Sequence, residues 1–267
     1  MRLPIFKRLC AGIVLVFAVC GSARAQRPEL VLQTGHASQI LSAAFSSDAK
    51  LLATRGADGV KLWDIATGRM LRTFAPAQEI GSNVAFSPDD RSVAWGYKGE
   101  QKLEVRDLVR GELKLNLAGT PSVSGIHHIA FSADGGMIAA ANADRTVTLW
   151  DARKGVALRV IKGFPAPVTA VAFSADGTRL TTTAEDLSGR AAGAIGVWEV
   201  ATGKSLKSFK SGAGLGPLAL SRDGGTVAAS SAPGAACATK VWDAASSGVA
   251  RELQTCSTYP VALSRDG

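Results

Sequence analysis

Residues that carry catalytic chemistry are scarce in this sequence. Its 267 residues include 3 His and 4 Cys, which leaves little material for a metal centre or for a nucleophile activated by a base. The G-x-S-x-G motif, which presents a reactive serine on a sharp turn, is also absent. We therefore expect a chain that is not itself an enzyme, with no catalytic residue, no bound cofactor and no metal ion.

Long hydrophobic runs are missing too. A membrane-spanning helix needs about 20 apolar residues, whereas the run at residues 10–20 has eleven. That run follows a basic segment (residues 2–8) and precedes Ala-Arg-Ala at 23–25, the pattern of a cleaved secretory signal. The sequence predicts a signal peptide at 1–25 and an exported mature chain, periplasmic or extracellular, without a stable membrane anchor.

Much of the positive charge lies in that signal. It contains four basic and no acidic residues, so its removal lowers the net charge from +8 to +4. The remainder has no block of consecutive Lys or Arg. Because nucleic-acid binding depends on neutralising many phosphates, we expect no nucleic-acid partner.

What the sequence does contain is a repeat of about 44 residues. Stretches such as VAFSPDDRSVA and VAFSADGTRLT recur, and each holds one apolar anchor at the same place. The anchors are separated by 41, 45, 42, 47 and 43 residues, and they are Phe45, Phe86, Phe131, Phe173, Leu220 and Leu263.

A second anchor repeats in phase with the first. A Trp-Asp pair or a variant of it, followed by Gly, occurs once in each of five units. Within a unit the apolar residues alternate with period two, and the strands are separated by turn-forming stretches such as SADG and ATGK. The repeated Asp residues are therefore interpreted as turn residues: Asp48, Asp89, Asp134, Asp176, Asp223 and Asp266.

Four short strands per unit cannot bury a face alone, but such units gain a core by stacking around an axis. The predicted fold is an all-β propeller of four-stranded antiparallel blades, with five complete blades and the start of a sixth. The expected blades span residues 36–74, 77–117, 122–161, 164–209 and 212–254, with a partial blade at 257–267 in a propeller domain of 26–267.

The segment from Gly35 to Arg69 resembles a WD-repeat unit, with a Gly-His start and a Trp-Asp end. The resemblance covers about Leu30 to Gly267, and similar secreted bacterial chains carry such repeats directly after a signal peptide. It implies a buried hydrogen-bonded network that consists of His36, Thr54, Asp58 and Trp63. The other units place Ala77, Ser122, Phe164 and Ser211 where the first has histidine, so the network is expected to be broken in them.

The last nine residues, YPVALSRDG, match the inner strand and first turn of a further unit. We expect the sequence to be a fragment, truncated at its C-terminus, of a propeller with at least one more blade. An unpaired strand edge is prone to pairing with another chain, so self-association through the open blade edge is a further expectation.

Two cysteines, Cys237 and Cys256, remain after removal of the signal, and an exported protein favours a disulfide between them. Cys237 stands where the first unit has Asp58. The adjacent pair His127-His128 lies on a predicted inner strand, where neighbouring side chains point to opposite faces. We therefore expect no shared metal there.

The loops that vary most between units lie on the rim that carries the connections between blades. We expect a peptide or protein of unknown identity to dock there, and the candidate contacts are Arg55, Tyr97, Lys98, Asn142, Glu185, Asp186 and Arg190. The preferred function is a non-enzymatic interaction scaffold or sensor. The alternative is the regulatory propeller of a larger secreted enzyme, for example a caspase-like peptidase whose catalytic domain is outside this chain. A metal-dependent propeller hydrolase or lyase is a weaker alternative, because the inner strands are mostly Ala, Val, Ile and Phe.

Overall fold

The described residues of the computed structural model are all strands and turns. The model describes residues 35–37, 39–74, 80–97, 102–118, 125–184, 193–212, 219–221, 223–230, 239–244 and 248–253. Spatial clustering divides the chain into residues 1–32 and 33–267, and every described residue belongs to the second unit. The predicted signal peptide and partial sixth blade lie outside the described residues.

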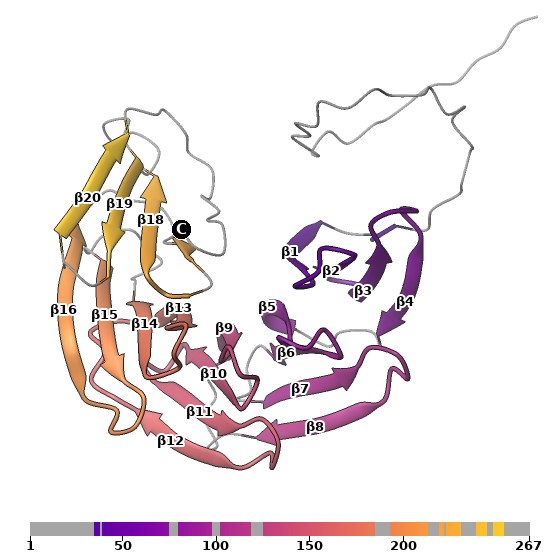
Figure 1. Ribbon diagram of the computed structural model, residues 1–267, viewed down its shortest axis with the longest axis horizontal. Coiled ribbons are helices and arrows are strands. Elements are labelled where there is room, and N and C mark those ends of the chain that lie inside the picture. The colour runs from indigo at the N-terminus through magenta and orange to yellow at the C-terminus, as the bar shows by residue number, and fades with distance from the viewer. Residues whose placement is uncertain are drawn as a thin grey trace, which may run out of the picture. The chain divides into compact units, whose positions relative to one another are not determined.

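Twenty strands form five four-stranded antiparallel sheets, the blades of a β-propeller (Figure 1). Blade 1 consists of β1 (Ile40–Phe45), β2 (Leu51–Gly56), β3 (Gly59–Asp64) and β4 (Met70–Phe74). Blade 2 consists of β5 (Ile80–Phe86), β6 (Ser92–Tyr97), β7 (Lys102–Asp107) and β8 (Leu113–Ala118). Blade 3 consists of β9 (Ile126–Phe131), β10 (Met137–Asn142), β11 (Val147–Asp151) and β12 (Ala157–Ile161).

Blade 4 consists of β13 (Val168–Phe173), β14 (Arg179–Ala184), β15 (Gly193–Glu199) and β16 (Ser205–Gly212). Blade 5 consists of β17 (Ala219–Leu220), β18 (Thr226–Ser230), β19 (Thr239–Asp243) and β20 (Gly248–Leu253). Within each blade, every strand pairs with the one that follows it, and the first strands of consecutive blades lie side by side. The predicted all-β propeller with five complete blades is confirmed.

The turn between the first and second strand of each blade is built from one serine and one aspartate. In blade 1, Ser46 Oγ donates to Asp48 Oδ1 at 2.7 Å and accepts from Leu51 N at 2.9 Å. The same Ser–Asp bond recurs in the other four blades at 2.5–2.7 Å. The aspartates from Asp48 to Asp223 are therefore turn residues, as predicted, while Asp266 lies outside the described residues.

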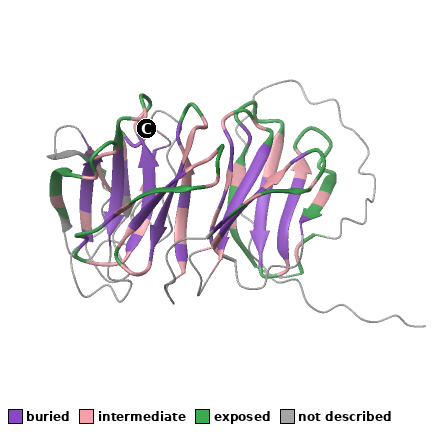
Figure 2. Cartoon of the chain, turned by 90° about the horizontal axis from the view of Figure 1, so that it is seen from below, coloured by how far each residue is buried: buried purple, intermediate pink, exposed green. Residues whose placement is uncertain are grey.

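The hydrophobic core lies between neighbouring blades, because each sheet buries its faces against the next sheet. Figure 2 shows the buried strands of the blades. Between blades 1 and 2 the contact includes Phe74 and Trp95, whose ring centroids are 5.7 Å apart. Similar clusters join blades 2 and 3, 3 and 4, and 4 and 5.

The two rims of the blades are distinct in what they carry. The turn rim bears the Ser–Asp turns, such as residues 46–50, and the turns before each fourth strand, such as residues 65–69. The connection rim bears the turns between second and third strands, such as residues 57–58, and the links between blades. The sequence-based docking surface was expected on the connection rim.

Candidate interaction surface

Four side chains of blade 1 form one hydrogen-bonded network. His36 Nδ1 lies 2.5 Å from Asp58 Oδ1, and its Nε2 lies 2.8 Å from Thr54 Oγ1. The indole of Trp63 donates to the same threonine oxygen at 2.7 Å. The imidazole is buried, with 2% of its side chain exposed. The structure thus brings together the four residues that the sequence pattern singled out, and their role is to tie β2, β3 and the segment before β1.

Asp58 is the charged centre of this network. Its second oxygen accepts from Ala37 N at 3.0 Å and lies 3.2 Å from Lys61 Nζ, which also donates to Gly35 O. Burial alone would raise the pKa of Asp58, but the hydrogen bonds from His36, Ala37 and Lys61 outweigh it and hold that pKa well below its usual range. The carboxylate is therefore ionised at neutral pH.

Blade 4 keeps half of the network. Trp198 donates to Thr182 Oγ1 at 2.9 Å, which repeats the bond between Trp63 and Thr54. Phe164 occupies the histidine position, and its ring centroid is 4.4 Å from that of Trp198. An aromatic contact has therefore replaced a polar one.

In blade 3 the bond from tryptophan to threonine is absent among the described residues. Trp150 is 1% exposed, and its indole N–H is buried without a hydrogen-bond partner. The position of Thr54 is taken by Ala140 there, which has no acceptor to offer. The expected break in this blade agrees with the structure, and the candidate positions Ala77, Ser122 and Ser211 have no described side chain.

Blade 2 carries a different cluster that the sequence reasoning missed. Trp95 stands at the threonine position, and Tyr97 lies next to it at 3.4 Å between the indole nitrogen and the phenol oxygen. The buried Glu104 pairs with Arg106 at 3.0 Å and with Lys102 at 3.6 Å. Lys102 also lies 4.8 Å from the centre of the Tyr97 ring. The sequence signal for this cluster is that Trp95 replaces the threonine of the repeat and Arg106 replaces its tryptophan.

Two of the expected docking residues are not on the surface. Arg55 is 9% exposed and Asn142 is 0% exposed, so the expectation that these two candidates are exposed on the connection rim is wrong. The amide of Asn142 donates to Thr146 and Thr148 across the β10–β11 hairpin. Both residues lie in the last two positions of the second strand of their blade, and their side chains pack within the sheet rather than in the loop.

Of the other docking candidates, only Tyr97 lies among the residues that the structure describes. Tyr97 is half-buried at the connection rim and contacts Lys102. The docking candidates Lys98, Glu185, Asp186 and Arg190 lie outside the described residues, as do both cysteines of the predicted disulfide, Cys237 and Cys256.

The His127-His128 pair differs from its expected geometry. The register of β9 and β10 shifts at this point, so the strict alternation of side chains is interrupted. His127 Nδ1 lies 3.1 Å from Val168 O on β13, whereas His128 Nδ1 is buried without a hydrogen-bond partner. The expectation that the pair shares no metal ion stays a prediction. Burial lowers the pKa of His128 to about 4, so it is neutral at pH 7.

The residues that the structure describes contain no group of three or more His, Cys, Asp or Glu that could hold a metal ion. They also contain no helix of the length and hydrophobicity that a membrane crossing requires.

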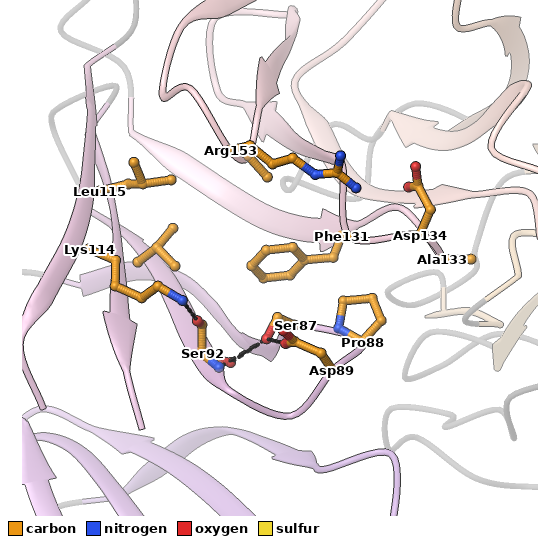
Figure 3. Close-up of a pocket in the computed structure, with 13 residues that line it drawn as sticks. Ser87, Pro88, Asp89, Ser92, Lys114, Leu115, Phe131, Ala133, Asp134 and Arg153 are labelled. Atoms are coloured by element: carbon orange, nitrogen blue, oxygen red, sulfur yellow. Dashed lines mark hydrogen bonds between the residues drawn. The ribbon is translucent and has the colours of Figure 1, made fainter. Parts of the chain in front are cut away.

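A cavity lies on the turn rim, between blades 2 and 3. Its volume is about 610 Å³, and Figure 3 shows the residues around it. Blade 2 contributes the Ser87–Asp89 turn and Lys114, while blade 3 contributes Phe131, Asp134 and Arg153. Such a volume suits one or two side chains of a partner.

A smaller cavity of about 180 Å³ adjoins the first. The two share Pro88, Phe131 and Ala133 as lining residues, so they form one continuous depression on the turn rim. The smaller one is lined by turn residues of all five blades, from Ser47 in blade 1 to Asp223 in blade 5. Sequence reasoning missed this surface because it followed loop length, and these turns are short.

Comparison with known proteins identifies the repeat. The model of the WD domain, G-beta repeat, matches residues 28–64, 111–151 and 155–189. Protein tipD of Dictyostelium discoideum is 32% identical over 148 residues, which are 55% of this chain and 24% of that protein. WD repeat-containing protein SL1-17 of Schistosoma mansoni is 29% identical over 154 residues, 57% of this chain and 50% of that protein.

Autophagy-related protein 16 of Arabidopsis thaliana is 27% identical over 189 residues, which are 70% of this chain and 35% of that protein. The chain therefore spans half or less of the length of these relatives. Together with the five propeller blades, these matches support the assignment of the chain as a WD-repeat protein.

Proposed function

We propose that this protein is a non-enzymatic interaction scaffold that docks a peptide or protein on its turn rim. WD-repeat propellers are typical of such scaffolds, and the relatives include proteins named for autophagy and for telomerase. The same kind of repeat in such different settings favours a general binding module. The names of these relatives give no support to the alternative of a regulatory propeller for a peptidase.

The observation that carries the proposed location is the continuous depression on the turn rim. It combines the half-buried ring of Phe131 with charged and hydroxyl groups from two blades. Apolar surface supplies binding free energy, and a few placed polar groups supply orientation. Tyr97 on the connection rim is retained as the competing location.

The proposal also includes export of the mature chain. A protein cleaved before Gln26 would begin at that residue, which N-terminal sequencing of the purified product from the native host can measure. An intact Met1 N-terminus in a cytosolic fraction would contradict this part of the proposal.

Photo-crosslinking tests the docking site. We would place p-benzoylphenylalanine at the exposed Ala133 on the turn rim or at Tyr97 on the connection rim, and irradiate each variant in an extract of its native compartment. A discrete cross-linked protein at position 133 that is absent at position 97 is the expected result. Cross-links at position 97 alone would move the site to the other rim, and none at either position would contradict the scaffold function.

A further inference from the structure

Two of the blade interfaces are closed by an arginine from the outer strand. Arg72 on β4 donates from Nη1 to Arg110 O at 3.2 Å and from Nη2 to Val109 O at 2.8 Å. Arg159 on β12 does the same to Thr202 O and Ala201 O, at 3.0 and 2.7 Å. In each case a guanidinium binds two successive carbonyl groups in the turn of the next blade.

The interface between blades 2 and 3 lacks this arginine. Arg72 and Arg159 each stand four residues after the glycine of the preceding turn, and Leu115 stands at the same distance from Gly111. The structure agrees with this spacing. Each of the three side chains packs on the turn glycine of the next blade: Arg72 on Gly111, Leu115 on Gly155 and Arg159 on Gly203.

The turn of blade 3 that contains Gly155 therefore has no guanidinium from blade 2. Its two matching carbonyl groups belong to Arg153 and Lys154, and no hydrogen bond from a described residue reaches either of them. The cavity of about 610 Å³ opens at this same place, lined by Leu115, Ala152 and Arg153. The residue that replaces the arginine, Leu115, and the first residue of the carbonyl pair, Arg153, therefore both border this cavity.

The walls of this cavity carry two carboxylates. Asp134 and Asp89 both line it. The bond from Ser132 and the backbone N–H of Gly136 lower the pKa of Asp134. Burial would raise the pKa of Asp89, but the bonds from Ser87 and the backbone N–H of Arg91, together with the charges of Lys114 and Arg91, outweigh that effect and lower it. Both carboxylates are therefore charged at neutral pH, and Phe131 offers an aromatic face between the walls (Figure 3).

The cavity has two basic groups of its own. Lys114 on the blade 2 wall is held by a 2.9 Å bond to Ser92 Oγ, and Arg153 lies beside Asp134 on the blade 3 wall (Figure 3). These two charges balance those of the two aspartates. The unbonded carbonyl pair is therefore the feature that selects a ligand, and a planar guanidinium with parallel N–H groups fits it better than a single ammonium.

We propose that the cavity between blades 2 and 3 binds the guanidinium group of an arginine on a partner protein. That arginine would take the place that Arg72 and Arg159 occupy at the neighbouring interfaces. This inference rests on the proposed scaffold function and names the side chain that the docking site recognises.

The test uses the ¹⁵N-labelled full chain and a small probe, N-acetyl-arginine amide, with the citrulline and lysine analogues as comparisons. We expect saturable chemical-shift changes at the amides of Arg153, Lys154 and Gly155 with arginine. Citrulline lacks the charge and should bind at least about tenfold more weakly. The variant Leu115→Arg supplies the guanidinium from within, so it should lose the response. The matched control Asn116→Arg, on the opposite face of β8, should keep it.

A second variant tests the proposal even if Leu115→Arg does not fold. Arg72→Leu removes the arginine between blades 1 and 2, so it should gain an added arginine response at the amides of Val109 to Gly111. Absence of saturable shifts at 153–155 in the native chain, or an unchanged response in folded Leu115→Arg, would overturn the proposal. The probe needs no partner, so this site can fail while cross-links from position 133 persist, and the two failures remain distinct.

Discussion

Blade 1 and blade 4 share a bond from tryptophan to threonine but differ in what covers it. In blade 1 a histidine and an aspartate complete a polar network around Thr54. In blade 4 the ring of Phe164 packs on Trp198 instead. A buried network of hydrogen bonds has to be complete to be stabilising, whereas an aromatic contact depends on area alone. The comparison suggests that a blade can keep its geometry through either chemistry.

The largest expected effect on stability concerns the aromatic contact of Phe164 with Trp198 in blade 4. Phe164→Ala removes a ring that is 7% exposed and in contact with Trp198, and a buried Phe→Ala change costs about 3–4 kcal/mol in the free energy of unfolding. Urea denaturation measures this. The control Phe45→Ala alters a ring that is 63% exposed, and it should change stability by less than about 0.5 kcal/mol. A large effect at Phe45 would mean that this face of blade 1 is covered in solution, for example by a second copy.

The polar version is tested by Asp58→Ala. It leaves His36, Lys61 and the amide of Ala37 without their shared acceptor, and we expect a loss of about 3 kcal/mol because charged hydrogen bonds are removed from a partly buried site. Thermal unfolding of the variant gives the measurement. A loss below about 1 kcal/mol would show that water replaces the carboxylate.

Blade 5 offers a third chemistry at the same place, since Cys237 stands at the position of Asp58. If Cys237 and Cys256 form a disulfide, reduction should lower the free energy of unfolding by roughly 2–3 kcal/mol for a loop of this length. Peptide mapping with and without reductant measures the bond. Identical Cys237 and Cys256 peptides in the two digests would exclude the disulfide.

The shared threonine allows a smaller and more exact comparison. Thr54→Val affects a hydroxyl that contacts both His36 and Trp63, and it should cost about 2 kcal/mol. Thr182→Val affects one indole bond, and it should cost about 1 kcal/mol. Equal losses in the two variants, from parallel urea titrations, would contradict a role for His36 in the network.

The smallest effect is a dependence on pH. The folded-state pKa of Asp58 lies below its unfolded value. Its stabilising contribution is therefore fully present above about pH 4 and is lost as the pH falls through the folded-state pKa. The difference in stability between the native chain and Asp58→Asn should accordingly shrink as the pH is lowered from 5 to 2. A difference that stays constant over this range would mean that the charge of Asp58 has no part in the network.

Phe45 shows that the repeat pattern does not predict the exposure of a residue. Its counterparts Phe86 and Phe173 are 6% and 2% exposed, because each packs against the preceding blade. Phe45 has the same sequence context but no described blade on that side. The same repeat position is therefore buried in blades 2 and 4 and exposed in blade 1, which shows that a neighbouring blade decides the exposure.

The docking site illustrates the same limit. Arg55 and Asn142 were chosen because they adjoin the loops of the connection rim, and both are buried. The exchange of arginine for Leu115 is visible once the units are aligned on their turn glycines. Its consequence, a cavity between two blades, requires knowledge of which strand covers which turn.

The sequence alone determined the strand pattern, the turns and the network of blade 1, since each depends on residues within one unit of about 44 positions. Period-two alternation fixes which residues share a face, and the Ser–Asp pair fixes the turn. Only the tertiary structure decided which faces are covered, which carbonyl groups remain unbonded and where the cavities lie. These features arise between blades, where side chains some 40 residues apart meet, and a local pattern has no information about that contact.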